Sequence, residues 1–212
     1  MLDINKFHSQ ILAANVSTAV LLPDNYNKVD TIYKPIYILT TSNPFLNDSK
    51  YQEFVNSADV ALVAIYPSLD VKKNELLYDS FNTEYDFSKQ YQSFILDTVI
   101  KNITTLYRLS NKFNDKYLVG IDKTSLLGFT MPLDFTTTFG HLYSINLDID
   151  NKADFLAYVK SKFDPQIEIN LSLINKDIQK EIKDILKLFG IISYNDFDTN
   201  NLLDTLVNIC EM

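Results

Sequence analysis

The sequence predicts an α/β fold, with a mostly parallel sheet, helices on both faces of that sheet and an antiparallel hairpin at the start. From residue 35 to the end, short apolar runs of strand length alternate with longer runs of helical period. The apolar runs are continuous, as in parallel strands that are covered on both faces. Two extended stretches separated by Asn15 precede them and predict the hairpin. Because no internal repeat or low-complexity linker interrupts this order, we expect one domain spanning residues 1–212.

The composition argues against several classes of function. The chain has 212 residues and is 46% hydrophobic, which is enough for a sizeable core. Its net charge is −8 without a basic cluster, and Arg108 is the single arginine, so we expect neither nucleic-acid binding nor a bidentate phosphate clamp. Cys210 is the single cysteine, which leaves no internal disulfide and no cysteine metal cage. With only four glycines the chain lacks a glycine-rich nucleotide loop, and we expect no cofactor.

The sequence also carries no sign of membrane insertion or export. Residues 1–10 lack a basic region followed by an apolar run, so they do not resemble a signal peptide. No window approaches the roughly 18 consecutive apolar residues of a transmembrane helix. We therefore expect a cytoplasmic protein that does not bind membranes.

The first half of the chain predicts a hairpin followed by two buried strands with a helix between them. Continuous apolar runs that end near Pro44 and Pro67 have the length and bounds of buried strands. Between them, apolar residues recur at helical spacing after Asp48 and Ser49, either of which can cap a helix. A polar stretch rich in aromatic residues then predicts a long surface loop. The expected elements are strands at residues 7–14, 16–22, 35–41 and 59–66, a helix at 48–57 and the loop at 68–87.

The second half alternates between helical and strand patterns. A long amphipathic helix comes first, and the remaining helices each follow an apolar run of strand length. Gly190 supplies a helix stop near the end of the chain. The expected helices are residues 88–109, an apolar run from Leu126 to Met131, 153–160, 177–189 and 199–210. The expected strands are 117–119, 142–147, 166–173 and 191–194.

The central stretch, residues 117–134, combines a buried strand, a tight polar turn and an apolar helix. This is the local context of a nucleophile elbow, whose pattern is Gly-x-Ser-x-Gly. Here the corresponding residues read Gly120-Ile121-Asp122-Lys123-Thr124. The first glycine is present, Asp122 replaces the serine and Thr124 replaces the second glycine. We therefore expect an elbow that is degenerate in its chemistry.

The order of elements resembles the esterase D and tributyrin-esterase kind of α/β-hydrolase, which includes S-formylglutathione hydrolase-like proteins. The resemblance covers nearly the whole chain and rests on the elbow context and on short strings. These strings are Leu22-Pro23-Asp24-Asn25-Tyr26 after the hairpin, Lys34-Pro35 before the first central strand and Tyr66-Pro67 at the end of the next one. The resemblance implies a three-layer sandwich with a mostly parallel central sheet, and a serine-esterase ancestry.

The chain departs from this family at each catalytic position. The family's His-Gly oxyanion loop is replaced by Thr40 and Thr41, followed by Ser42 and Asn43. The position of the family's acid is closest to Asn175, although Asp177 could take a shifted role. The family's histidine follows the last strand, but no histidine follows His141 in this sequence. Because nucleophile, base and oxyanion donors act as a unit, losing all three should leave little activity.

Several candidate residues allow both a functional and a structural interpretation. Asp122 could be a nucleophile, but we favour a turn aspartate that caps the following helix. Ser125 could be a displaced nucleophile, but serine is common in the first turn of a helix. Asp148 and Asp150 could bind a hard cation weakly, although a solvated loop is the better interpretation.

The last candidate functional residues are the two histidines and the aromatic residues of one loop. His8 and His141 are isolated from carboxylates at metal-ligand spacing, so we expect an exposed His8, a structural or exposed His141 and no metal site. The aromatic residues of the long loop could line a ligand groove or a partner surface, or pack locally. They are Tyr78, Phe81, Tyr85 and Phe87.

Two functions follow from these observations. The first is a catalytically degenerate esterase-like protein, a pseudoenzyme that acts in binding or assembly with an active paralogue or with a second copy of itself. The second is a carboxylic-ester hydrolase with an altered centre around Asp122, Ser125 and Asp177. An enzyme needs a pocket that gathers these side chains, whereas a binding protein should fill that pocket, and Lys123 and Thr124 favour filling.

Overall fold

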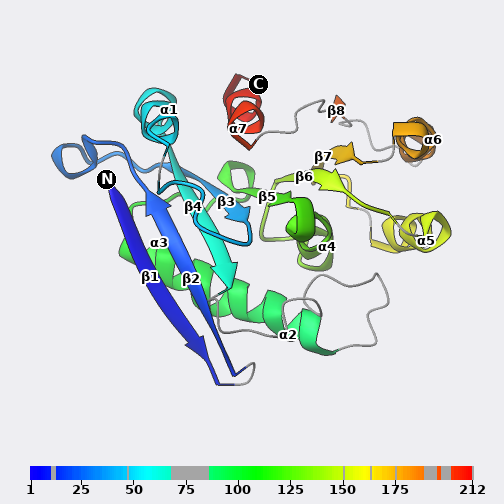
Figure 1. The fold of residues 1–212 in the computed structure, drawn as a ribbon, viewed down its shortest axis with the longest axis horizontal. Coiled ribbons are helices and arrows are strands. Elements are labelled where there is room, and N and C mark those ends of the chain that lie inside the picture. The colour runs from blue at the N-terminus through cyan, green and yellow to red at the C-terminus, as the bar shows by residue number, and fades with distance from the viewer. Residues whose placement is uncertain are drawn as a thin grey trace.

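In the computed structural model, an eight-stranded sheet runs through the molecule in the order β1-β2-β4-β3-β5-β6-β7-β8 (Figure 1). The structure describes residues 1–10, 13–46, 48–67, 86–149, 151–162, 164–174, 176–188, 195–196 and 202–211. The strands are β1 (Leu2–Ser9), β2 (Ala14–Leu21), β3 (Lys34–Leu39), β4 (Val60–Pro67), β5 (Tyr117–Ile121), β6 (His141–Leu147), β7 (Glu168–Leu173) and β8 (Asn195–Asp196).

The sheet is antiparallel at its start and parallel from β4 onward. β1 pairs with β2, and β2 pairs with β4, both in antiparallel register. Every pair from β4–β3 to β7–β8 is parallel. The parallel strands therefore begin at one edge of the sheet, which we call the amino edge, and end at the opposite carboxyl edge. The predicted fold class, a mostly parallel sheet with an N-terminal antiparallel hairpin, is confirmed.

Helices cover both faces of the sheet (Figure 1). One face carries α1 and α7, and the other carries α2, α3 and α4. The described helices are α1 (Lys50–Ala58), α2 (Asp86–Phe94), a π-helical stretch (Ile95–Ile100), α3 (Lys101–Leu106), α4 (Ser125–Asp134), α5 (Lys152–Lys162), α6 (Lys176–Leu188) and α7 (Leu202–Glu211).

Alternate residues of the central strands supply the two cores, because successive side chains of a strand point to opposite faces. In β3, Ile36 and Ile38 pack with α1 and α7, whereas Tyr37 and Leu39 pack with α2, α3 and α4. A third cluster joins α4, α5 and α6 to β6 and β7, and Phe129 stacks on Phe155 at its centre. These positions are fully buried, which explains why the sequence of these strands is apolar without alternation.

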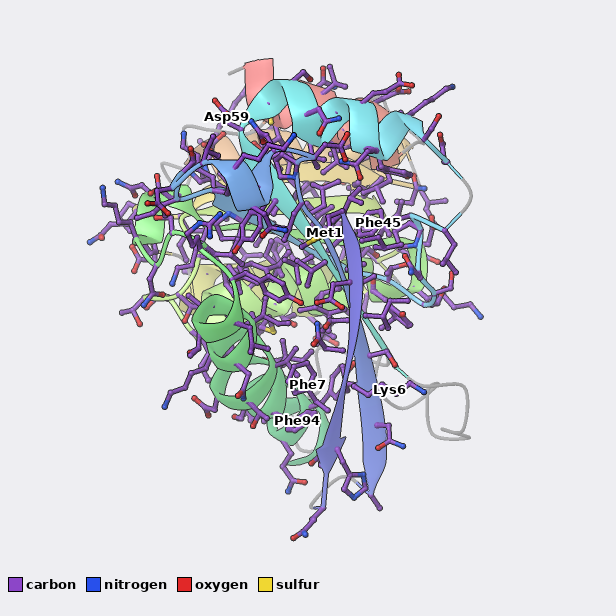
Figure 2. All side chains as sticks on the ribbon, turned by 90° about the vertical axis from the view of Figure 1, so that its left-hand side faces the viewer. Met1, Lys6, Phe7, Phe45, Asp59 and Phe94 are labelled. Atoms are coloured by element: carbon purple, nitrogen blue, oxygen red, sulfur yellow. The ribbon has the colours of Figure 1, made fainter. Side chains whose placement is uncertain are left out.

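The hairpin of β1 and β2 packs against the α2–α3 side of the molecule. Phe7 and Phe94 both pack on the buried core of that side, and Figure 2 shows them next to each other. The Tyr107 hydroxyl donates to the Asp3 carboxylate at 2.5 Å and accepts a hydrogen bond from Asn5 at 3.0 Å. The first strand is therefore fixed by polar contacts along the face that meets the end of α3.

Some predicted boundaries were wrong. The first strand runs from Leu2 to Ser9 rather than over residues 7–14. The prediction missed its start because β1 is an outermost strand, and its many exposed polar side chains hide the alternating hydrophobic pattern of a strand. The long helix begins at Asp86, which places Phe87 in a helix rather than in the loop. It ends at Leu106 because Tyr107 is extended and the chain then forms a bridge between Tyr33 and Leu109.

Other predictions fall on residues outside the described ranges. The loop residues Tyr78, Phe81 and Tyr85 are among them, as are Gly190 and the predicted strand at 191–194. The last strand that the structure describes is β8, at Asn195–Asp196, and the closing helix is described from Leu202.

Candidate functional site: the strand-to-helix turn after β5

The turn between β5 and α4 has the geometry of an elbow. β5 ends at Ile121, a short 3-10 turn covers Asp122–Thr124, and α4 starts at Ser125. Asp122 has a φ of 52°, in the left-handed region that non-glycine residues rarely occupy. Such a conformation costs roughly 1–3 kcal/mol and persists only when the surrounding structure determines it. The aspartate at the nucleophile position therefore has the sharp backbone turn expected of an elbow.

Two glycines let α4 approach β5 closely. A Cβ atom added to Gly120 would lie 2.6 Å from the Thr124 carbonyl oxygen and 2.8 Å from the Gly128 Cα. A Cβ atom added to Gly128 would lie 2.5 Å from the Gly120 Cα. Both contacts involve backbone, which has little freedom to move away. The sequence interpretation used Gly120 and missed Gly128, whose signal is a lone glycine inside an otherwise apolar helix.

The Asp122 side chain is exposed and points to the end of the neighbouring strand. Its Oδ1 atom accepts a hydrogen bond of 2.8 Å from the Nδ2 atom of Asn146. Asn146 lies at the irregularity near the end of β6 and is itself left-handed, with a φ of 56°. The expected helix cap at Asp122 was wrong, because α4 begins without a side-chain cap. The carboxylate is held by a neighbouring amide instead.

Thr124 is buried and links three segments. Its Oγ1 atom donates to the carbonyl of Leu39 at 2.6 Å and accepts from the N–H of Ile121 at 3.0 Å. Only 1% of its surface is exposed. Thr124 thus joins the end of β3 to the end of β5, where the elbow pattern of the family has a glycine. Lys123 is exposed, and it forms no ion pair within the described part of the chain.

Ser125 is a buried residue of the first helical turn. Its hydroxyl donates to the Asp122 carbonyl at 2.6 Å, and its own carbonyl accepts from the Ser144 hydroxyl at 2.8 Å. These bonds tie the elbow to the middle of β6. The hydroxyl is directed into the turn, so the geometry describes a structural role for this serine.

The loop after β3 is the segment that the sequence resemblance assigns to the oxyanion loop. The Thr40 N–H donates to the Ile65 carbonyl at 3.1 Å, so this donor is already used by the sheet. Asn43 turns the loop by accepting a hydrogen bond of 2.9 Å from the Phe45 N–H through its side chain. Thr41 and Ser42 are exposed. One of the donors that an oxyanion would need is therefore engaged in the fold.

The two candidates for the family's acid residue are only partly described by the structure. Asn175 is not among the described residues. Asp177 lies in the first turn of α6, after β7, but its side chain is also outside the described part. Its backbone follows the carboxyl end of a parallel strand, as does that of Asp122.

Neither histidine lies near the elbow. His8 is in the hairpin and shares a hydrogen bond of 2.8 Å with Asn15. His141 is the first residue of β6 and therefore lies at the amino edge, opposite Asp122. Its Nδ1 atom is 2.7 Å from a Glu168 carboxylate oxygen, its Nε2 atom is 3.0 Å from the Asn114 carbonyl oxygen, and its ring stacks on Tyr117. The hydrogen bond from His141 lowers the pKa of Glu168.

The other candidate residues are not gathered at one site. Asp148 is exposed at the end of β6, and Asp150 is outside the described residues. Among the residues that are described, no three His, Cys, Asp or Glu side chains come together as a metal site. Within the same residues, no helix has both the length and the hydrophobicity needed to span a bilayer.

Solved esterase structures share this fold over nearly the whole of this chain. A ferulic acid esterase matches with a TM-score of 0.73 and 10% identity, covering 99% of this chain and 96% of that one. An IroE-like serine hydrolase from Shewanella oneidensis gives 0.72 and 14%, covering 99% and 78%. An S-formylglutathione hydrolase from Staphylococcus aureus gives 0.67 and 14%, covering 100% and 96%. At the level of sequence, no protein-family model and no curated protein matches.

The chain therefore has the α/β-hydrolase fold of esterases, as the sequence predicted. In the structure, the elbow follows β5, the loop at residues 40–43 follows β3, and Asp177 follows β7. Asp122, held by Asn146, and Lys123 are exposed polar groups at the elbow.

Proposed function

We propose that this chain is a catalytically inactive esterase-fold protein that acts in binding or assembly. One observation carries the proposal: a carboxylate held by an amide occupies the nucleophile position, and neither histidine of the chain is beside it. His141 lies at the opposite edge of the sheet, and His8 lies on β1, which β2, β4 and β3 separate from β5. Ester hydrolysis at an elbow needs a base that removes a proton from the nucleophile or from water. An aspartate bonded to Asn146 has no such base beside it among the described residues.

The proposed partner is a second copy of the chain or an active paralogue, and the proposed location is the cytoplasm. A fold that keeps its core while its site residues change is suited to such a role, because fold and function are separable. Sedimentation of the purified chain over a range of concentrations tests self-association. A single monomeric species at every concentration would leave the paralogue as the remaining partner of this proposal.

Hydrolysis of short-chain p-nitrophenyl esters tests the absence of catalysis. We expect the wild type, Asp122→Asn and Ser125→Ala to give the same rate, equal to that of buffer containing an unrelated folded protein. Urea unfolding of each variant serves as the control for folding. A wild-type rate above this background that either substitution abolishes would refute the inactive assignment.

A second candidate is a carboxylic-ester hydrolase with an altered centre near Asp122. The observation that favours it is the retained left-handed backbone at Asp122, combined with a carboxylate that is exposed to solvent. In this alternative Asp122 attacks the ester carbonyl and expels the alkoxide, and water then cleaves the resulting anhydride. Asp177, the carboxylate that could take a shifted form of the family's acid role, would assist this reaction. Activity that disappears in Asp122→Asn but survives in Ser125→Ala would support it.

A further inference from the structure

A small cavity opens at the amino edge of the sheet, on the opposite side from the elbow. Its volume is about 210 Å³, and it lies between the first residues of β3, β4 and β5 and the last residues of α1 and α7. Figure 2 shows one of its rim residues, Asp59, at the end of α1. The residues that matter to the argument are Lys34, Ile36, Asp59, Tyr117, Ile209 and Cys210.

The base of the cavity is apolar and its size is modest. Ile36 and Ile209 are 0% and 5% exposed, so they belong to the buried core as well as to the cavity wall. At roughly 30 Å³ for each water molecule, the volume corresponds to about seven waters. Pockets for drug-sized ligands start near ~300 Å³. The cavity is therefore suited to a ligand with few non-hydrogen atoms and a short apolar group.

The rim carries one charge of each sign. Lys34 and Asp59 are both exposed, and neither forms an ion pair within the residues that the structure describes. Asp59 follows the last turn of α1 in a left-handed conformation with a φ of 51°. Both α1 and α7 end at this cavity, and helix carboxyl ends carry partial negative charge. The Asp59 side thus favours a cation, and the Lys34 side favours an anion.

The remaining polar groups of the rim are neutral. Burial raises the pKa of the Tyr117 hydroxyl, and the neighbouring Cys210, Glu168 and Asp115 add to this effect. Burial also raises the pKa of the Cys210 thiol, although Lys34 acts in the opposite direction. Both groups therefore keep their protons near neutral pH and can form hydrogen bonds without adding charge.

We propose that this cavity binds a small zwitterion of the α-amino-acid class with an aliphatic side chain. The ligand's carboxylate faces Lys34, its ammonium faces Asp59 and the carboxyl end of α1, and its side chain packs on Ile36 and Ile209. A simple amine or a simple carboxylate would pair with only one of the two rim charges. The proposal does not rest on the elbow, because the cavity lies at the opposite edge of the sheet.

Calorimetric titration of the full chain with L-leucine tests this proposal. Two probes remove one charge each: 4-methylpentanoate lacks the ammonium group, and isopentylamine lacks the carboxylate. Each should bind up to about fivefold more weakly than L-leucine, the upper end of the effect of losing one exposed ion pair. Absence of binding by L-leucine at millimolar concentrations, or equal binding of all three probes, would overturn the proposal.

Variants assign each charge to its partner. In Lys34→Gln, L-leucine and isopentylamine should bind equally, because the carboxylate no longer has a partner. In Asp59→Asn, L-leucine and 4-methylpentanoate should bind equally, and asparagine tolerates the left-handed backbone at this position. Lys28→Gln and Asp122→Asn are controls away from the cavity and should leave all three affinities unchanged. L-leucine binding that neither cavity variant weakens would show that the ligand site lies elsewhere.

Discussion

Replacing Thr124 with the glycine of the elbow pattern should destabilise this protein. In Thr124→Gly the carbonyl of Leu39 and the N–H of Ile121 both lose their side-chain partner inside the structure. Each lost hydrogen bond costs about 1 kcal/mol, and the buried methyl group contributes about 0.8 kcal/mol. The flexibility of glycine in the unfolded chain adds about 0.5–1 kcal/mol. The expected loss is therefore about 3–4 kcal/mol, a large part of the ~5–15 kcal/mol by which proteins of this kind are stable.

Two further substitutions at Thr124 separate these contributions. Thr124→Ser keeps the hydroxyl and should lose about 1 kcal/mol, whereas Thr124→Val keeps the volume and should lose about 2 kcal/mol. The assay is urea unfolding, and the comparison requires that the slope against urea stays constant among the variants. Ser42→Ala, at an exposed residue of the loop after β3, is the control for substitution itself. A glycine variant as stable as the wild type, or a valine variant more stable than the serine variant, would refute the role of the hydroxyl.

Three other predictions concern the elbow and the amino edge. Asp122→Asn should unfold at the same urea concentration as the wild type because asparagine tolerates a left-handed backbone, whereas Asp122→Val should lose about 1–2 kcal/mol. Gly128→Ala should lose up to about 2 kcal/mol, since overpacking against Gly120 costs about 1–3 kcal/mol and alanine recovers about 1 kcal/mol of helix propensity; a gain in stability would contradict the close contact. The hydrogen bond from His141 lowers the pKa of Glu168 in the folded protein. The ionised Glu168 carboxylate therefore stabilises the fold at a pH above the ordinary glutamate pKa, and this contribution is lost as the pH falls through the lowered pKa of the folded protein. Urea unfolding from neutral pH to pH 3 should therefore show a smaller loss for Glu168→Gln than for the wild type, and identical pH profiles would refute this.

Hydrophobic patterning carried most of the fold prediction. The continuous apolar runs of β3 and β4 identified buried parallel strands, because both faces of these strands are covered by helices. The same signal failed for β1, which is the outermost strand of the sheet and exposes most of its side chains. It also could not locate the end of α3, which is set by contacts between the following residues and the distant Tyr33.

The sequence predicted where the elbow lies in the fold, but it did not predict which residues contact the elbow. The elbow could be placed because Gly120 lies between a strand and a helix, which is a local pattern. The hydrogen-bond partner of Asp122 could not be predicted, because Asn146 belongs to another strand and reaches the elbow only through the pairing of β5 with β6. The role of Gly128 and the bond from Thr124 to Leu39 likewise depend on the distance between segments that are separated along the sequence.

The backbone turn of the elbow is held by contacts that do not involve the Asp122 side chain. The left-handed conformation of Asp122 is unfavourable by itself, so neighbouring contacts must maintain it. The approach of Gly128 to Gly120 fixes the distance between α4 and β5, and Thr124 and Ser125 fix the turn through hydrogen bonds to Leu39, Ile121 and the Asp122 carbonyl. Each of these contacts involves backbone or buried groups rather than a group that would meet a substrate. Another residue that tolerates the left-handed backbone at position 122 should therefore leave the turn intact, and an elbow-like backbone alone is weak evidence for hydrolase activity.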